Sequence, residues 1–253
     1  MKILCANQVS LEFDELNNRV RMGKKTVEIP GNVIMQSGDI VKIDGRSYVL
    51  LDFSIPLFSS IAHRGAQIID AKDASYMVTS GNIKYGSRVL ESGTGSGALT
   101  VAILKVVGDP GFYTGVDHSD ESARITKNNV RNLSGMDVHI NVEEFENFDP
   151  EGKRFDAIFL DLPEPWKNVE RQKTWISPGS RIVTYLPTTN QLEKTVYEYT
   201  ESGFYHLESV ELSMRQMQVK KDAVRPVSSG IIHTGYISTF VKLSGSVLNI
   251  SNS

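Results

Sequence analysis

Cysteine is almost absent from this chain of 253 residues, in which Cys5 is the only one. A disulfide within the chain is therefore impossible, and a structural zinc ion held by several thiolates is excluded as well. We predict no metal site. A single thiol is consistent with the reducing cytoplasm, which is where we expect the protein to work.

Long apolar runs are also missing. No stretch approaches the roughly 18 consecutive apolar residues that suggest a membrane span. Residues 1–6 are too short and turn polar too soon to read as a signal peptide. We therefore expect a soluble protein that does not bind a membrane.

Neither sign of charge dominates, because the formal net charge is only -3. Hydrophobic residues make up 40% of the chain and charged residues 23%, an ordinary globular balance. A chain of this length can bury a sizeable hydrophobic core and does not need disulfide bonds or a structural metal ion to fold. Because the molecule as a whole is not basic, any RNA-binding surface must be local or assembled from several subunits.

Short strands separated by turn signals fill roughly the first 60 residues. The apolar or alternating runs cover residues 10–13, 19–22, 26–29, 40–43 and 47–52. Asp44-Gly45 stands between two alternating runs and is a strong hairpin signal. We predict a small antiparallel β domain over residues 1–62, built as a barrel or as a half-open sandwich.

Buried-type strands alternate with helical stretches after about residue 63. Strands are expected at residues 88–91, 112–116, 138–142, 155–160 and 181–186, and helices at 97–107, 121–133 and 191–202. This βαβα order predicts an α/β domain over residues 63–246, with a Rossmann-like, doubly wound parallel sheet. Two further runs, 205–214 and 235–243, would close it with an antiparallel hairpin.

A glycine loop follows the first strand of this domain: Glu91-Ser92-Gly93-Thr94-Gly95-Ser96-Gly97. Glycines let the backbone approach a ligand closely, and the next helix offers free N–H groups. Asp117 ends the following strand, 24 positions after Gly93, where a carboxylate can accept from both ribose hydroxyls. Loop and acid together indicate a nucleotide cofactor, while the alternative for Asp117 is a cap on the next helix.

Glu91, the acid before the glycines, helps to decide which of two cofactors the loop binds. Gly93, Gly95 and Ala98 also satisfy the dinucleotide pattern of NAD enzymes. Glu91-x-Gly93-x-Gly95-x-Gly97 is the usual first motif of class I methyltransferases, in which the loop passes beneath the methionine part of S-adenosyl-L-methionine (SAM). We predict SAM, bound by Glu91, the loop 93–97 and Asp117. An NAD-dependent oxidoreductase stays open, although no convincing Tyr-x-x-x-Lys or histidine relay accompanies the loop.

A second motif, Asp161-Leu162-Pro163-Glu164-Pro165-Trp166, follows the apolar strand that ends at Leu160. The carboxyl ends of such strands open into the ligand crevice of the sheet, and two prolines stiffen the loop. We predict that Asp161 is catalytic and also contacts the cofactor. A rigid turn before a helix would explain the prolines alone, and Trp166 suits either a substrate base or the core.

With these motifs the chain resembles the archaeal and bacterial tRNA (adenine-58-N1)-methyltransferase family, from about residue 63 to 243. The other matching pieces are Ala71-Lys72-Asp73-Ala74, Gly86-Ser87-Arg88-Val89-Leu90-Glu91, Tyr185-Leu186-Pro187-Thr188 with Gln191, Arg225-Pro226 and His233-Thr234-Gly235. The resemblance implies a class I methyltransferase fold, SAM, a tRNA substrate and N1 of the T-loop adenine 58 as acceptor. It also implies a homotetramer, the preceding adenine 57 as a second acceptor, and Asp161 as the catalytic residue.

Two positions depart from the family pattern. Members often have Tyr-Pro before Lys-Asp-Ala, where this chain has Asp70-Ala71, so an aromatic contact with the base is not carried over. The acid that meets the adenine of SAM often follows a glycine, whereas this chain reads Asn141-Val142-Glu143-Glu144. Glu143 is our candidate for this contact.

The residues fit a direct transfer. SAM carries its own electrophile, so the enzyme has to hold acceptor, methyl group and sulfur in line. Adenine N1 has a free lone pair once the base is extruded from the folded tRNA. A carboxylate that accepts from the exocyclic amine would orient the base and offset the positive charge left on it, a role that suits Asp161.

Other candidates and other functions stay open. Lys220, Lys221, Arg215 and Arg225 form a basic excess that is either an RNA contact, through Arg225 among others, or a solvated loop. His233 is a candidate substrate contact, although such a histidine is more often structural. A methyltransferase for proteins or small molecules and a non-catalytic RNA-binding subunit are the remaining alternatives. The proline-rich motif argues against the former, and the glycine loop together with Asp161 against the latter.

Overall fold

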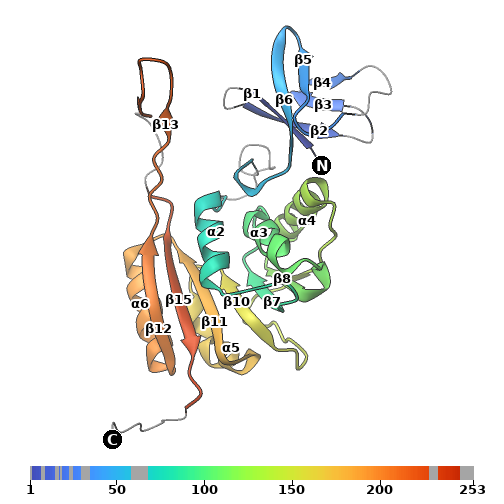
Figure 1. The fold of residues 1–253 in the computed structure, drawn as a ribbon. Coiled ribbons are helices and arrows are strands. Elements are labelled where there is room, and N and C mark those ends of the chain that lie inside the picture. Colours follow the sequence, from blue (N-terminus) through green and yellow to red (C-terminus); the bar gives the residue numbers. More distant parts are fainter. Residues whose placement is uncertain are drawn as a thin grey trace, which may run out of the picture.

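The computed structural model describes residues 2–6, 9–14, 17, 19–22, 25–29, 35–57, 68–227 and 233–245. One sheet lies before residue 53 and a second, larger one after residue 88, with a small ribbon beyond it (Figure 1). The domain boundary that we predict after residue 62 falls outside the described residues. In the part of the chain that is described, no helix is long and apolar enough to cross a membrane.

Six antiparallel strands make the N-terminal sheet. They are β1 (Lys2–Ala6), β2 (Val9–Asp14), β3 (Arg19–Met22), β4 (Lys25–Glu28), β5 (Ile40–Ile43) and β6 (Arg46–Asp52), in the order β4-β3-β2-β1-β6-β5. Alternate residues such as Leu4, Tyr48 and Leu50 face a core that belongs to this sheet alone. Asp44 and Gly45 turn between β5 and β6 with φ angles of 48° and 77°, so the predicted hairpin is confirmed.

Seven strands make the larger sheet. They are β7 (Val89–Ser92), β8 (Tyr113–Asp117), β9 (Ile140–Val142), β10 (Phe155–Leu160), β11 (Ile176–Leu186), β12 (Phe204–Glu211) and β15 (Tyr236–Lys242), in the order β12-β15-β11-β10-β7-β8-β9. Neighbours from β11 to β9 pair in parallel, and β15 pairs antiparallel with β11 and β12. The predicted parallel sheet with a closing antiparallel hairpin is confirmed.

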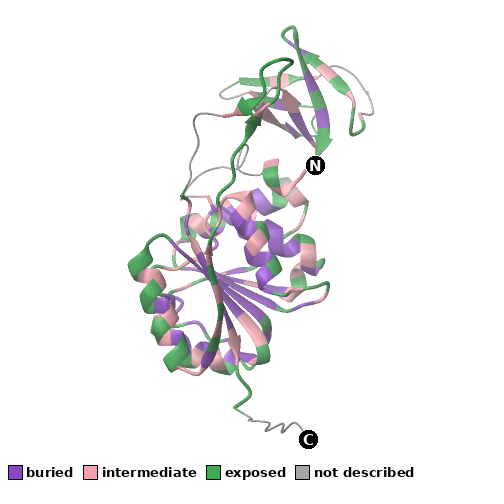
Figure 2. Ribbon diagram, turned by 60° about the vertical axis from the view of Figure 1, so that its left-hand side comes forward, coloured by how far each residue is buried: buried purple, intermediate pink, exposed green. Residues whose placement is uncertain are grey.

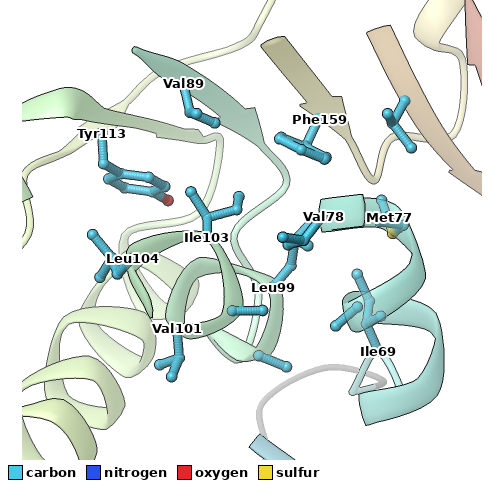
Figure 3. Packing of buried hydrophobic residues seen from close by; sticks show 14 of the residues in the cluster. Ile69, Met77, Val78, Val89, Leu99, Val101, Ile103, Leu104, Tyr113 and Phe159 are labelled. Atoms are coloured by element: carbon cyan, nitrogen blue, oxygen red, sulfur yellow. The ribbon is translucent and has the colours of Figure 1, made fainter. Parts of the chain in front are cut away.

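Helices cover both faces of this sheet (Figure 1). They are α2 (Ala71–Ser80), α3 (Ala98–Val107), α4 (Asp120–Ser134), α5 (Val169–Trp175) and α6 (Thr189–Glu201), with the 3-10 turns η1 (Pro110–Phe112) and η2 (Pro165–Asn168). Val89 faces the core under α2, α3 and α4 (Figure 3), whereas its neighbour Leu90 faces the core under α5 and α6. Burial on both faces explains why the parallel strands are continuously apolar.

A long arm leaves the sheet between β12 and β15. It carries the ribbon β13 (Met217–Gln218) with β14 (Arg225–Pro226) and extends well beyond the sheet (Figures 1 and 2). Tyr236, the first residue of β15, pairs with both Leu186 and Glu211. The arm therefore starts at the carboxyl end of β11, which is the ligand side of a parallel sheet.

Candidate active site

The first glycine of the loop, Gly93, has no room for a side chain. Gly93 has a φ of +83°, and a Cβ atom there would lie 2.1 Å from the backbone oxygen of Asp161. Its N–H donates to the backbone oxygen of Val116 at 2.9 Å. The loop thus passes directly against the end of β10, and the two motifs found in the sequence meet through their backbones.

Two polar residues of α4 hold the rest of the loop. Thr126 Oγ1 donates to the backbone oxygen of Gly95 at 2.9 Å, and Asn129 Nδ2 donates to that of Ser96 at 2.9 Å. Both side chains are buried, and buried polar groups persist where their hydrogen bonds are made. Neither is among the sequence candidates. The available signal was two polar residues, three apart, on the inward side of an amphipathic helix.

Asp117 ends β8 with its carboxylate turned toward the loop. Oδ2 accepts from the Gly95 N–H at 3.1 Å and from Thr94 Oγ1 at 3.2 Å, while Oδ1 accepts from the Ser119 N–H at 3.0 Å. Asp117 thus lies beside the glycine loop, where a ribose acid is expected, and its carboxylate also holds the turn before α4. The cap of α4 itself is Ser119, whose hydroxyl accepts from the Ser122 N–H at 3.2 Å, so the interpretation of Asp117 as a helix cap is wrong.

Glu91 is buried at the end of β7. Its Oε2 accepts from Tyr113 OH at 2.6 Å and from Thr100 Oγ1 at 2.8 Å, while Oε1 has no partner among the described residues. Burial raises the pKa of Glu91 to about 8, although the two hydroxyl donors act in the opposite direction. The first acid of the motif thus keeps one oxygen able to accept a hydrogen bond.

Asp161 follows β10 in a partly buried position. Its N–H donates to the backbone oxygen of Ser92 at 2.9 Å. Burial, together with the nearby charge of Asp117, raises the pKa of its carboxyl group to about 7. A ligand that brings positive charge between these two acids would relieve their repulsion.

Side chains of α5 and α6 anchor the proline-rich loop that carries Asp161. The backbone oxygen of Pro165 accepts from Gln172 Nε2 at 2.8 Å and from Tyr199 OH at 3.1 Å. Gln172 and Tyr199 are buried in α5 and α6, so two helices fix the loop. The stiffness expected from two prolines is thus reinforced by hydrogen bonds to carbonyl groups.

A cavity of about 310 Å³ opens beside these groups. Its lining comes from the glycine loop, the end of β8, the turn after β9 and the proline-rich loop. The lining residues are Ser92, Gly93, Asp117, His118, Glu144, Phe145, Glu146, Leu162, Pro163, Glu164, Pro165, Lys167 and Asn168. Glu144 lines this cavity and Glu143 does not. The Glu143 N–H donates to the backbone oxygen of Asp117 at 3.0 Å, which fixes the start of this turn beside the end of β8.

A wider hollow of about 750 Å³ lies elsewhere, on the outer face of α4. It is lined by Asp120, Glu121, Ala123, Arg124, Lys127, Asn128, Arg131 and Val142. None of the site residues expected from the sequence belongs to this surface. The smaller cavity, which joins both motifs, is therefore the candidate active site.

Of the sequence candidates, Gly93 and Asp117 line the cavity, while Asp161 adjoins two lining residues, Gly93 and Leu162. Three weaker candidates are also outside the lining. Trp166 packs against the core, with Lys194 Nζ 4.6 Å from its ring centroid. Arg225 is exposed on β14 of the arm. His233 Nδ1 contacts Glu211 Oε1 at 2.6 Å, and this hydrogen bond raises the pKa of His233. The structure brings together Glu91, the glycine loop, Asp117 and Asp161 instead.

The chemistry of the cavity suits SAM. Four carboxylates line it, from Asp117, Glu144, Glu146 and Glu164, against the single lysine Lys167. Such a lining accepts hydrogen bonds from ribose hydroxyls and an ammonium group and favours a cation, but it repels a pyrophosphate. Within the described residues, no group of three or more His, Cys, Asp or Glu could hold a metal ion.

Comparison with known proteins agrees with this chemistry. Residues 48–240 match the family described as "tRNA methyltransferase complex GCD14 subunit". The chain is 32% identical over 193 residues to the tRNA (adenine(57)-N(1)/adenine(58)-N(1))-methyltransferase TrmI of Methanocaldococcus jannaschii, covering 66% of this chain and 68% of that protein. It is 32% identical over 168 residues to tRNA (adenine(58)-N(1))-methyltransferase TrmI of Thermus thermophilus, covering 66% of each.

Solved structures extend the likeness over nearly the whole chain. The crystal structure of tRNA (m1A58) methyltransferase TrmI from Aquifex aeolicus has a TM-score of 0.78 and 26% identity, covering 96% of both chains. A SAM-dependent O-methyltransferase from Thermotoga maritima has a TM-score of 0.81 at 23% identity, covering 98% and 94%, which shows the fold alone. The fold is that of SAM-dependent methyltransferases. With the family match across most of its length, the chain belongs to the GCD14 family of tRNA methyltransferase subunits.

Proposed function

We propose that this protein transfers the methyl group of SAM to N1 of adenine 58 in the T-loop of tRNA, with adenine 57 as a second acceptor to test. The observation that carries the proposal is Asp161, held by a rigid loop against the glycine loop of an acidic cavity. The TrmI relatives are named for tRNA adenines, which supports tRNA over a protein or a small molecule as acceptor.

The cofactor residues have distinct tasks in this proposal. The backbone of residues 93–97 lies under the methionine part of SAM, and Asp117 accepts from the ribose hydroxyls. Glu144, which lines the cavity, is a better candidate for the adenine of SAM than its neighbour Glu143. Glu91, just before the loop, ties β7 to α3 and β8 through its hydrogen bonds with Thr100 and Tyr113.

SAM, when bound, supplies a methyl group on a positively charged sulfur. The chain has to hold the acceptor base in line with that methyl group, since orientation supplies much of the rate. Asp161 accepts from the exocyclic amine of the adenine and leaves the N1 lone pair free for the new bond. Its carboxylate then faces the positive charge that the transfer leaves on the ring.

The enzyme assay is methyl transfer from labelled SAM to an unmodified tRNA transcript, followed by mass spectrometry of the nucleosides. We expect 1-methyladenosine, which disappears when adenine 58 of the transcript is replaced by guanine. If a transcript with guanine in place of adenine 57 also takes up less methyl, adenine 57 is a second acceptor. SAM binding without transfer to tRNA would refute the substrate and leave a methyltransferase for another acceptor.

The proposed homotetramer draws support from the arm. Met214, Met217, Val219 and Val224 are 53–74% exposed there, an unusual concentration of apolar side chains on one protruding segment. A second copy of the chain would bury them. Light scattering of a variant with Met217, Val219 and Val224 all changed to Ser would then report a smaller assembly than the wild type.

We also propose a cytoplasmic location, where tRNA is found. Cys5 carries a free thiol, which fits a reducing compartment.

A further inference from the structure

A buried polar cluster lies at the start of α2, outside the cofactor cavity. Lys72 Nζ donates to both carboxylate oxygens of Asp73 at 2.8 Å and to Thr234 Oγ1 at 2.6 Å. Asp73 is fully buried, and Tyr185 OH lies 3.4 Å from its Oδ2. The cluster therefore fastens three segments to one another: the first turn of α2, the end of β11 and the turn before β15.

The turn before β15 is shaped to admit Tyr185. A Cβ atom on Gly235 would lie 2.5 Å from Tyr185 Cζ, so the glycine is needed for the ring to lie against this turn. Tyr185 is 7% exposed, and burial together with the charge of Asp73 raises the pKa of its phenol. The ring is thus a neutral, tightly held group.

Tyr185 lies at the level of the catalytic candidate. Leu160 of β10 pairs with Thr184 of β11, so the next residues, Asp161 after the end of β10 and Tyr185 within β11, lie side by side. The charge of Asp161 also contributes to the raised pKa of the Tyr185 phenol. Whatever fixes Tyr185 therefore also shapes the space next to Asp161, on the side away from the cofactor loop.

Stability alone does not explain an ion pair at this place. Taking a carboxylate and an ammonium group out of water is expensive, and well-packed apolar residues of similar size often stabilise a protein as well or better. All three donors of Lys72 Nζ are directed at Asp73 and Thr234, which gives the cluster one defined geometry.

We propose that Lys72 and Asp73 are positioning residues for methyl transfer, which act through Tyr185 and the Thr234–Gly235 turn on the base that Asp161 receives. The inference rests on the proposed function and adds two residues to its acceptor side. Neither residue touches the cofactor cavity, so their loss should change turnover and leave SAM binding intact.

The test compares Lys72→Met, Asp73→Asn and the double variant with the wild type. We expect kcat on the tRNA transcript to fall about 10- to 100-fold, the scale of a small misplacement of reacting groups. The dissociation constant of SAM, measured by calorimetry, should stay within about twofold, because none of its contacts changes. Lys72→Arg keeps the cation and should recover most of the rate.

A second tie between α2 and the sheet supplies the matched control. Tyr76 OH donates to Glu208 Oε1 at 2.9 Å, and Tyr76→Phe removes this bond at a site away from Asp161. We expect Tyr76→Phe to keep wild-type kcat. A loss as large as that of Asp73→Asn would mean that any loosening of α2 slows transfer, which would overturn a specific role.

The double variant and Tyr185→Phe separate positioning from folding. With both charges removed, the double variant should melt closer to the wild type than either single variant, yet stay slow. In a Tyr185→Phe background, Asp73→Asn should lower kcat only slightly further, because both substitutions act through the side chain of Tyr185. A double variant as active as the wild type, or losses that add fully, would refute the proposal. A wild type without tRNA transfer would instead refute the proposed function.

Discussion

Single carboxyl groups at the ligand end of the sheet have unusual proton affinities. Burial raises the pKa of Asp161 to about 7 and that of Glu91 to about 8, so at neutral pH each group can hold a proton that it would lose in water. A group with a native pKa above its unfolded value binds protons more tightly in the folded state. Between about pH 4 and 7, ionisation of Asp161 therefore favours the unfolded chain.

This leads to a prediction for Asp161. Because transfer needs the carboxylate, kcat/KM for tRNA at low SAM should rise with pH through about 7, and Asp161→Asn should remove both the activity and this rise. The positive sulfur of SAM lowers the pKa of a nearby acid. At saturating SAM, kcat should therefore still rise with pH, but the midpoint of the rise should lie at a lower pH. Rate profiles from pH 5.5 to 9 test this, and a flat kcat/KM would refute it.

The same ionisation has an opposite effect on stability. At pH 8 the folded wild type holds a buried charge that Asp161→Asn lacks, so the variant should melt at a higher temperature there. At pH 5 the Asp161 carboxyl group is largely protonated in the folded protein, and the difference should shrink. Both melting temperatures are measured without SAM. An inactive variant that also melts lower at pH 8 would contradict the account.

Gly93 gives a third prediction at this scale. A Cβ atom would lie 2.1 Å from the Asp161 backbone oxygen, so Gly93→Ala must displace the end of β10 and should abolish both SAM binding and transfer. Gly135 is the control, since its φ is +73° but nothing lies within 4 Å of a Cβ. Gly135→Ala should cost only the backbone strain, about 1–2 kcal/mol, and keep SAM binding. If Gly93→Ala and Gly135→Ala lowered the SAM affinity equally, backbone strain and not the clash with Asp161 would explain the loss.

Elements were predictable from sequence where local pattern and burial agree. The run 155–160 coincides with β10, since both faces of that strand are buried. The pattern of α2 is harder to read because Asp73, a charged residue, is among its buried positions. β11 begins at Ile176, earlier than expected, because Pro178 and Gly179 look like a strand boundary.

Contacts between elements were beyond the sequence. Thr126 and Asn129 hold the glycine loop from α4, but only the packing of α4 against β8, β9 and α3 shows this. The choice between Glu143 and Glu144 likewise depends on which of them lines the cavity, and that follows from the path of the turn after β9. A one-residue shift in a turn reverses which side chain faces a cavity, and no periodic pattern extends through such a turn.

The contacts of α4 give a prediction at the element scale. Thr126→Val and Asn129→Leu keep much of the side-chain volume but leave the backbone oxygens of Gly95 and Ser96 without their donors, at about 1–3 kcal/mol each. The loosened loop should bind SAM roughly 10-fold more weakly, since about 1.4 kcal/mol is a factor of ten. Asn128→Leu, on the exposed side of α4, is the control. Calorimetry showing equal SAM affinity in all three variants would refute the role of α4.

At the scale of the molecule, the two sheets have separate cores. The cluster of Leu4, Phe13, Tyr48 and Leu50 shares no residue with the two clusters of the larger sheet. Among described contacts that join the two parts, Lys105 Nζ lies 3.3 Å from the backbone oxygen of Phe53 and 5.0 Å from its ring centroid. The sequence predicted both units, while the boundary near residue 62 stays a prediction.

Separate cores predict separate melting. Scanning calorimetry should show two transitions, because each sheet buries a hydrophobic core of its own. SAM at 100 times its dissociation constant stabilises the unit that binds it by about 2.7 kcal/mol, which for a unit of this size raises its melting temperature by roughly 5–10 °C. The transition of the N-terminal sheet should not move. In Gly93→Ala, which should not bind SAM, neither transition should respond. A single transition that shifts as a whole with SAM would mean that the two sheets unfold as one cooperative unit.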